Sequence, residues 1–341
     1  MIKVLVVDDS LFMRTLISDM LNSDPEIKVI ATAKDGQEAM KKLSRIKPDC
    51  ITLDLAMPGW DGLTTLEHIM SEHPTPVIIL SAHSKKDADI TIKCLNAGAV
   101  GFILKPSGEL SLDIKDVKHQ LLEEVKVASR AEVGRIKLLV TKRPKRPGRK
   151  LAAINKIVVI GASTGGPQTL EGILYSLPLN FTAPVIVVQH MPSRFFTESL
   201  AEHLNRACDL EVKVVQNHEV LKAGKVYLAP SGSQLTLKLR GKEIISCLNK
   251  AVADILTPSV DITMKSVAEV YNGNAIGVIL TGMGRDGCEG MQAIKESDGK
   301  TVVQDETSLI FGMPKAVIDA GCADKALPAD RIADAMMELV S

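Results

Sequence analysis

Short apolar runs alternate with longer amphipathic stretches along this chain, a pattern typical of α/β proteins. In the first part, residues 2–7, 50–53, 77–80 and 101–104 are apolar enough to form strands that are covered on both faces. In the second part, residues 157–160, 183–188 and 276–280 do the same. Both parts therefore favour parallel sheets flanked by helices, and the second favours a doubly wound, mostly parallel sheet.

Residues 230–256 break this pattern. Apolar residues alternate with polar ones on either side of Arg240 and Gly241, which predicts a β-hairpin. We expect this antiparallel hairpin to be an addition to the main sheet. After it, Thr257 and Pro258 predict the N-cap and first turn of a helix.

The chain divides at a basic segment. A length of 341 residues is enough for roughly two domains. Residues 141–150 hold six basic residues, two prolines and a glycine, a composition that cannot bury a core. We therefore predict one domain over residues 1–122, a linker over 123–152 and a second domain over 153–341. Without interleaved aromatic residues, the basic run favours a solvated tether over a nucleic-acid site.

The composition of the chain mainly argues against certain partners and locations. The 41 basic and 41 acidic residues cancel, so no overall field favours nucleic acid or a membrane as a partner. No apolar run approaches the length that spans a bilayer, and the first strand ends in acids, which argues against a signal peptide. We expect a cytoplasmic protein without direct membrane insertion. The six cysteines form no C-x-x-C pair, so buried thiols are expected.

Polar residues gather at the predicted strand ends of the first domain. Asp8 and Asp9 follow the first strand, and Asp54 follows the strand at 50–53. Ligands bind at the carboxyl ends of parallel strands, and adjacent carboxylates there repel unless a cation neutralises them. Ser81 and Lys105 follow two further strands. The set suits Mg²⁺ and a phosphoryl group, although Asp8 and Asp9 can also be a helix N-cap.

This ordered set resembles the response-regulator receiver domain over about residues 1–122. The resemblance implies a flavodoxin-like fold of five βα repeats and an acyl phosphate on one aspartate. The implied roles are the phosphoacceptor for Asp54, Mg²⁺ ligands for Asp8, Asp9 and Asp54, phosphoryl contacts for Ser81 and Lys105, and the aromatic switch for Phe102.

The second domain begins with a strand that runs into a small-residue turn. Gly161, Ser163 and Gly165 match G-x-S-x-G, a pattern that presents a serine at a strand-to-helix corner. Such a corner can hold a phosphate on backbone N–H groups or expose a nucleophile. The dinucleotide pattern G-x-G-x-x-G fails because Ser163 occupies its second glycine.

Two later strand ends supply partners for this serine. His190 follows the strand at 183–188, and Asp286 lies in the glycine-rich loop after 276–280. In a doubly wound sheet these ends converge, and serine, imidazole and carboxylate form an acyl-transfer triad. Backbone N–H groups around Thr164 and Met283 are candidates for the oxyanion site. The order Ser, His, Asp differs from that of α/β-hydrolases.

Three other residues near these motifs are weaker candidates. Cys288 lies close to the glycine-rich loop, but no histidine is near it in sequence, so it ranks below Ser163 as a nucleophile. His203 lies on an apolar helical stripe and favours a core or boundary position. Asp261 falls in a first helical turn, where the helix dipole favours an acid, so its role is structural first and substrate-facing second.

The motifs of residues 153–341 resemble the chemotaxis receptor methylesterases of the CheB family. The matching segments are 161–166, 189–192, 258–261, 281–287 and 311–314. The resemblance implies hydrolysis of glutamate γ-methyl esters on chemoreceptors and deamidation of receptor glutamines, without a cofactor in this domain. It also implies phosphorylation by a chemotaxis histidine kinase, which opens the catalytic crevice. Thr257 stands where the family usually has arginine.

A second hypothesis is a response regulator whose output domain binds a ligand or DNA without catalysis. The sequence shows no helix-turn-helix and its basic residues concentrate in the linker, so nucleic acid is not an expected partner. Nucleotide binding at residues 161–166 is a third hypothesis.

Overall fold

The structure is a computed structural model, and it describes residues 1–106, 114–131, 133, 156–251 and 256–341. The chain forms two compact units, Met1–Lys137 and Leu138–Ser341. The last helix of the first unit, α5 (Ile114–Ala128), continues past residue 122. Residues 134–152 of the predicted linker lie outside the described residues.

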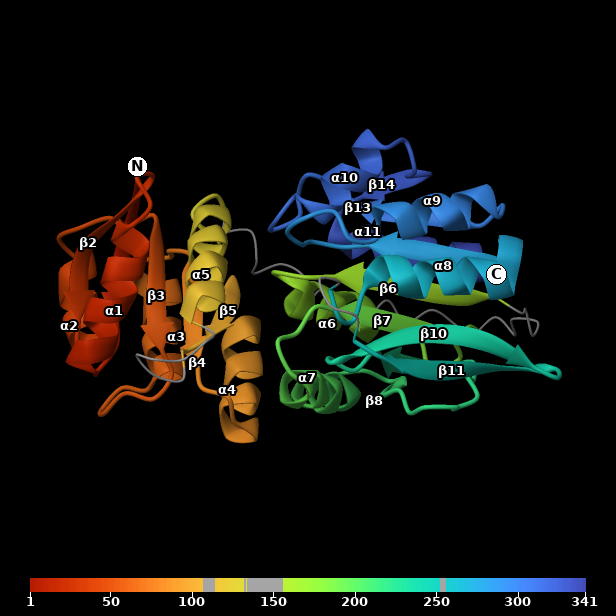
Figure 1. Cartoon of the computed structure of the whole chain (residues 1–341), viewed down its shortest axis with the longest axis horizontal. Coiled ribbons are helices and arrows are strands. Elements are labelled where there is room, and N and C mark those ends of the chain that lie inside the picture. The colour runs from red at the N-terminus through yellow and green to blue at the C-terminus, as the bar shows by residue number, and fades with distance from the viewer. Residues whose placement is uncertain (107–113, 132, 134–155, 252–255) are drawn as a thin grey trace. The chain divides into compact units, whose positions relative to one another are not determined.

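The first unit contains a parallel sheet of five strands (Figure 1). The strands are β1 (Ile2–Val7), β2 (Ile27–Ala33), β3 (Cys50–Asp54), β4 (Val77–Ser81) and β5 (Gly101–Leu104). They lie in the order β2-β1-β3-β4-β5, which confirms the predicted five βα repeats. The strand order reverses between β1 and β3, so the crevice at their carboxyl ends is the expected ligand site.

Polar side chains fix where the helices of this unit begin. The helices besides α5 are α1 (Leu11–Asn22), α2 (Gly36–Leu43), α3 (Gly62–Glu72) and α4 (Lys85–Asn96). Their N-caps Ser10, Asp35, Asp61 and Ser84 each accept a hydrogen bond from a first-turn N–H. Because Ser10 caps α1, the alternative that Asp8 and Asp9 cap this helix is wrong.

The second unit contains a parallel sheet of seven strands in the order β14-β13-β12-β6-β7-β9-β8. Its strands are β6 (Ile157–Ala162), β7 (Val185–Gln189), β8 (Glu211–Val214), β9 (Lys225–Leu228), β12 (Ala275–Ile279), β13 (Lys300–Gln304) and β14 (Lys325–Leu327). In this unit β6 comes first in the sequence. Strands β7, β9 and β8 lie on one side of it, and β12, β13 and β14 lie on the other side. The reversal lies between β6 and β12, as in a doubly wound fold.

Helices bury both faces of this sheet. They are α6 (Gly166–Tyr175), α7 (Arg194–Ala207), α8 (Val260–Tyr271), α9 (Cys288–Glu296), α10 (Met313–Asp319) and α11 (Ala329–Val340), with a 3₁₀ turn at Asn272–Asn274. Alternate strand residues such as Ile157 and Val159 pack in one core with Met264 of α8 and Met291 of α9. The intervening residue Val158 is also fully buried, so the strand is covered on both sides.

The predicted hairpin is present, but it does not extend the main sheet. Strands β10 (Ser233–Arg240) and β11 (Glu243–Lys250) form a separate two-stranded sheet. The expectation of an addition to the main sheet is therefore wrong. Side chains of α8 occupy one edge of the hairpin: Ser266 Oγ accepts from Leu237 N–H at 3.1 Å, and Thr263 Oγ1 donates to Leu235 C=O at 2.9 Å. The segment around Val220 bridges the other edge at Ile245.

Helix α8 also begins later than the sequence predicts. Its N-cap is Ser259, whose hydroxyl accepts a hydrogen bond from Ile262 N–H at 3.3 Å. Thr257 and Pro258, joined by a cis peptide bond, precede the cap. Val260, Met264 and Val267 lie on the inner face of this helix and are fully buried.

No helix formed by the described residues has both the length and the apolar character needed to cross a membrane.

Two neighbouring phenylalanines of α7 test the assignment of the core. Phe196 is fully buried, whereas Phe195 is 39% exposed. Removing a buried aromatic ring leaves a cavity, so Phe196→Ala should lower the free energy of unfolding by roughly 3–5 kcal/mol. Phe195→Ala is the matched control and should cost less than half as much. Urea unfolding of the full chain measures both, and equal losses would contradict the assigned core.

Candidate functional site

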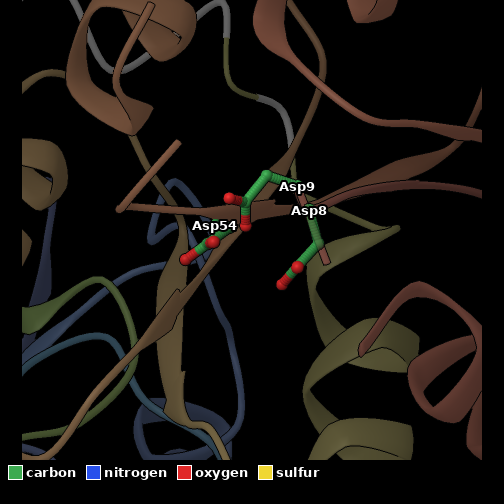
Figure 2. Close-up of side chains that lie close together, drawn as sticks. All are labelled: Asp8, Asp9 and Asp54. Carbon is green, nitrogen blue, oxygen red and sulfur yellow. The ribbon is translucent and has the colours of Figure 1, made fainter. Parts of the chain in front are cut away.

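Three carboxylates meet at the carboxyl ends of β1 and β3 in the first unit. Asp8, Asp9 and Asp54 each place an oxygen within 4.8 Å of the others' (Figure 2). The ammonium of Lys105, after β5, lies 2.8 Å from Asp8 Oδ2 and 2.8 Å from Asp54 Oδ1. The structure thus brings together four residues that the sequence predicted for this site.

Burial raises the energetic cost of keeping the carboxylates of this cluster ionised. Asp8 is fully buried, and this burial raises its pKa although the hydrogen bond from Lys105 acts in the opposite direction. Burial tends to lower the pKa of Lys105, but its hydrogen bonds to Asp54 and Asp8 outweigh that effect and raise it. Of the described cationic side chains, Lys105 is the one that forms ion pairs with these carboxylates, and one positive charge cannot balance three negative ones. An oxygen-only set with excess negative charge fits a hard divalent cation such as Mg²⁺.

Arginine and serine side chains complete the surroundings of the cluster. The guanidinium of Arg14 donates to the carbonyls of Asp8 at 2.7 Å and Asp9 at 3.0 Å, which fixes the end of β1. Ser81, predicted to contact the phosphoryl group, is fully buried at the end of β4, and its Oγ lies 2.9 Å from Thr91 Oγ1 on α4. Phe102 lies partly buried on β5.

In the second unit, strand register places Ser163 beside His190. Ala162 of β6 pairs with Gln189 of β7, and His190 N–H donates to the carbonyl of Ala162 at 3.0 Å. Ser163 and His190 are therefore the residues that directly follow this pair, one on each chain. Adjacent strands of a sheet lie about 5 Å apart. Within the described residues no hydrogen bond joins Ser163 Oγ to the imidazole. Such bonds commonly tighten only when substrate is present.

His190 and Asp286 are in direct contact. His190 Nε2 lies 2.8 Å from Asp286 Oδ2, and both side chains are largely buried. The acid comes from the loop after β12, the strand that borders β6 on the side opposite β7. Convergence of the three strand ends, predicted from sequence, thus produces the imidazole–carboxylate pair.

The N-terminus of α8 holds Asp286. Its Oδ2 accepts from Val260 N–H at 2.8 Å, and its Oδ1 accepts from Asp261 N–H at 2.9 Å and from Ser259 Oγ at 3.0 Å. Burial acts to raise the pKa of Asp286, but the hydrogen bonds from His190 and from these N–H groups lower it to about 2. The carboxylate is therefore ionised and oriented toward the imidazole at neutral pH.

Asp261 links α8 to α9, and its pKa is shifted in the opposite direction from that of Asp286. Its Oδ1 accepts a hydrogen bond from Gly290 N–H at 2.7 Å. Burial raises the pKa of Asp261 to about 6, with a contribution from the nearby charge of Asp286, although the Gly290 N–H acts to lower it. These contacts agree with the structural role that the sequence favoured for Asp261.

The loop at residues 281–284 lies against the turn that carries Ser163. A Cβ built on Gly282 would lie 2.8 Å from Ser163 Cβ, so only glycine permits this approach. The next residue, Met283, is partly exposed, and its N–H makes no hydrogen bond in the part of the chain that the structure describes. An unpaired donor beside a serine matches what an oxyanion site needs. Thr164, the other candidate, lies within the turn itself.

The other two weaker candidates, Cys288 and His203, are buried or paired within the fold. Cys288 is 5% exposed at the start of α9, and burial raises the pKa of its thiol. A protonated thiol is a poor nucleophile. His203 Nε2 lies 3.0 Å from Glu171 Oε2, between α7 and α6. These positions favour structural roles for both residues.

Two buried polar residues that were not predicted from the sequence, Gln189 and Thr281, contact the turn at Ser163 and Thr164. Both follow apolar strands at their carboxyl ends. Both also lie inside motifs that were selected for other residues, His190 and Asp286. A polar residue that ends a buried strand was the available signal.

Comparisons with known proteins match both parts of the chain. Residues 4–115 match the family model of the response regulator receiver domain, and residues 158–336 match that of the CheB methylesterase. A Thermotoga maritima protein named protein-glutamate methylesterase/protein-glutamine glutaminase is 44% identical over 99% of this chain and 98% of its own. A Geobacillus kaustophilus protein of the same name is 42% identical over 99% of each chain.

One solved structure supports the fold of the second unit. It is the crystal structure of the Thermotoga maritima CheB methylesterase catalytic domain, which has 45% sequence identity and a TM-score of 0.53. The match covers 55% of this chain and 99% of that one.

The raised pKa of Asp261 predicts a pH-dependent stability. An aspartate in an unfolded chain titrates near pH 4. Between about pH 4 and pH 6 the native state therefore binds more protons than the unfolded state, and stability falls as pH rises through this interval. Asp261→Asn keeps the acceptor for Gly290 but cannot ionise. The Tm of the variant minus that of the wild type should grow over this interval and stay constant above it. A difference independent of pH would contradict the assignment.

Proposed function

Because this chain belongs to the CheB methylesterase family and carries a response regulator receiver domain ahead of its catalytic part, we propose that it demethylates glutamate γ-methyl esters on chemoreceptors and deamidates receptor glutamines. The observation that carries the proposal is the contact of His190 with Asp286 beside Ser163. The Thermotoga maritima and Geobacillus kaustophilus relatives carry both activities in their names. A receptor substrate and a histidine kinase as phosphodonor complete the proposal.

The hydrogen bond between His190 and Asp286 assigns the nitrogens of the imidazole. An ionised carboxylate only accepts hydrogen bonds, so Nε2 carries the proton directed at Asp286. Nδ1 is then unprotonated and is the base for Ser163. Asp286 keeps this tautomer and stabilises the imidazolium that forms when the serine loses its proton.

The reaction proceeds in two steps. Ser163 Oγ attacks the ester carbonyl while His190 takes its proton, and the same proton then passes to the leaving methoxy group, which departs as methanol. Water, deprotonated by His190, next attacks the acyl-serine; the bond to Ser163 Oγ breaks, His190 returns the proton to that oxygen, and glutamate is released. With a glutamine substrate the leaving group is ammonia. The N–H groups of Met283 and Thr164 would stabilise the oxyanion in each step.

The acid cluster of the first unit supports phosphorylation as the regulatory signal. Asp54 is the proposed acceptor because the receiver resemblance implies this role for it, and a phosphoryl group placed there would remain within reach of the Lys105 ammonium. Asp8, Asp9 and Asp54 would hold Mg²⁺. When bound, the ion offsets the charge of the carboxylates and of the incoming phosphoryl group. Phosphorylation of Asp54 would raise the activity of the second unit.

Removal of the nucleophile tests the catalytic assignment. Ser163→Ala should reduce methanol release from a methylated receptor by at least about 10³-fold, because no other group replaces the acyl acceptor. Cys288→Ala is the control and should retain activity, since its buried thiol takes no part. An active Ser163→Ala variant together with an inactive Cys288→Ala variant would transfer the nucleophile to the cysteine.

Removal of the phosphoacceptor tests the regulatory assignment. A small-molecule phosphodonor with Mg²⁺ should stimulate ester hydrolysis by the wild type. Asp54→Asn cannot form the acyl phosphate and should show no stimulation, while its activity without donor should persist. Chelation of Mg²⁺ should also abolish stimulation of the wild type, because the carboxylates would again repel the donor. Equal stimulation of both proteins would refute Asp54 as the acceptor.

A further inference from the structure

We propose that Gln189 and Thr281 are positioning residues that hold the Ser163–Thr164 turn in the geometry needed for attack. This role rests on the proposed function, since it assumes that Ser163 is the nucleophile. Both side chains are almost fully buried, with exposed fractions of 4% for Gln189 and 0% for Thr281. They approach the turn from the two strands that flank β6, namely β7 and β12.

Gln189 joins the backbones of Ser163 and His190. Its Nε2 donates to the carbonyl of Ser163 at 2.9 Å and to the carbonyl of His190 at 3.1 Å. The regular ladder between β6 and β7 ends at the pair Ala162 and Gln189. Beyond that pair, His190 N–H still donates to the carbonyl of Ala162 at 3.0 Å, and the Gln189 amide adds a side-chain link between Ser163 and His190. The relative position of nucleophile and base therefore depends on this side chain.

Thr281 holds the other side of the turn. Its carbonyl accepts a hydrogen bond from Ser163 N–H at 3.0 Å, and its Oγ1 donates to the carbonyl of Thr164 at 3.0 Å. The same oxygen accepts from Ile310 N–H at 2.9 Å, which fixes the rotamer.

Thr281 is itself anchored, because its N–H donates to Oε1 of the buried Gln304 at 2.9 Å. Buried polar side chains thus connect the ends of β7, β6, β12 and β13.

Such anchors are needed because the turn has few side chains to pack. Gly165 adopts φ 77°, and a Cβ on Gly166 would lie 1.9 Å from Gln189 Oε1, so glycine makes room for the amide. Within the residues that the structure describes, that oxygen is buried and has no hydrogen-bond partner. A buried unsatisfied oxygen is costly, and an apolar side chain would avoid the cost. The glutamine is therefore better explained by the position of the turn than by stability.

Displacing a catalytic group by about 1 Å can cost on the order of 10²-fold in rate. Thr281→Val keeps the shape of the side chain and removes its hydroxyl, whereas Thr281→Ser keeps the hydroxyl. We expect Thr281→Val to lower kcat by roughly 10- to 100-fold with KM little changed, and Thr281→Ser to restore most of the loss. Gln189→Met should lower kcat in the same way, because it removes both hydrogen bonds.

The matched control is Thr301→Val. Thr301 is fully buried on β13, and its Oγ1 accepts from Asp324 N–H at 2.9 Å, away from the turn. This variant should lose a similar amount of thermal stability as Thr281→Val but keep its kcat. A fluorophosphonate that labels the reactive serine should react more slowly with Thr281→Val and Gln189→Met than with Thr301→Val.

The outcomes separate the two proposals. If kcat and labelling in Thr281→Val and Gln189→Met stay within about threefold of wild type while Ser163→Ala is inactive, the positioning role is wrong and the triad stands. A kcat that follows Tm equally in all three variants, Thr301→Val included, would also overturn it. Should Thr281→Val fail to fold, Gln189→Met set against Thr301→Val carries the same comparison. If Ser163→Ala keeps its activity, the proposed function itself fails.

Discussion

The hydrogen-bonded register of two parallel sheets decides where every polar residue of both sites lies. In a parallel sheet, all carboxyl ends reach the same edge, and where the strand order reverses, the helices that follow leave to opposite faces and open a crevice. The first unit places Asp8 and Asp54 at such a reversal, between β1 and β3. The second unit places Ser163 and the loop that carries Asp286 at another, between β6 and β12. Distant residues meet because their strands are neighbours.

The ends of helices then determine the charge that each crevice can keep. Asp286 is largely buried, yet it stays ionised because two N–H groups at the start of α8 and the imidazole of His190 donate hydrogen bonds to it. The neighbouring Asp261 cannot be stabilised to the same degree, and its pKa rises. The pair shows that one helix N-terminus supports one carboxylate well. Asp261 consequently depends on the N-terminus of α9, through Gly290.

The sequence could predict the elements and the residues at their ends, because apolar periodicity and glycine-rich turns are local signals. Ser163, His190 and Asp286 were predictable for that reason. The groups that bind the edge of the hairpin were not predictable. The hydroxyls of Thr263 and Ser266, which hydrogen-bond to its backbone, come from a helix that follows in the sequence. Ser259 was missed as the N-cap because Thr257 and Pro258 provide an equally good local pattern. Gln189 and Thr281 were overlooked because their roles appear only when neighbouring strands are paired.

The two crevices share one topology but differ in uncompensated charge, and that difference explains the chemistry proposed for each. In the first, three carboxylates face one ammonium, so the site gains most from a divalent cation and an anion that the cation can bind. In the second, hydrogen bonds from the N-terminus of α8 and from His190 already stabilise the carboxylate of Asp286, and Ser163 is neutral. An uncharged ester or amide can enter such a site without a counterion. The residue at the strand end, aspartate or serine, therefore accounts for the phosphoryl transfer proposed for one unit and the acyl transfer proposed for the other.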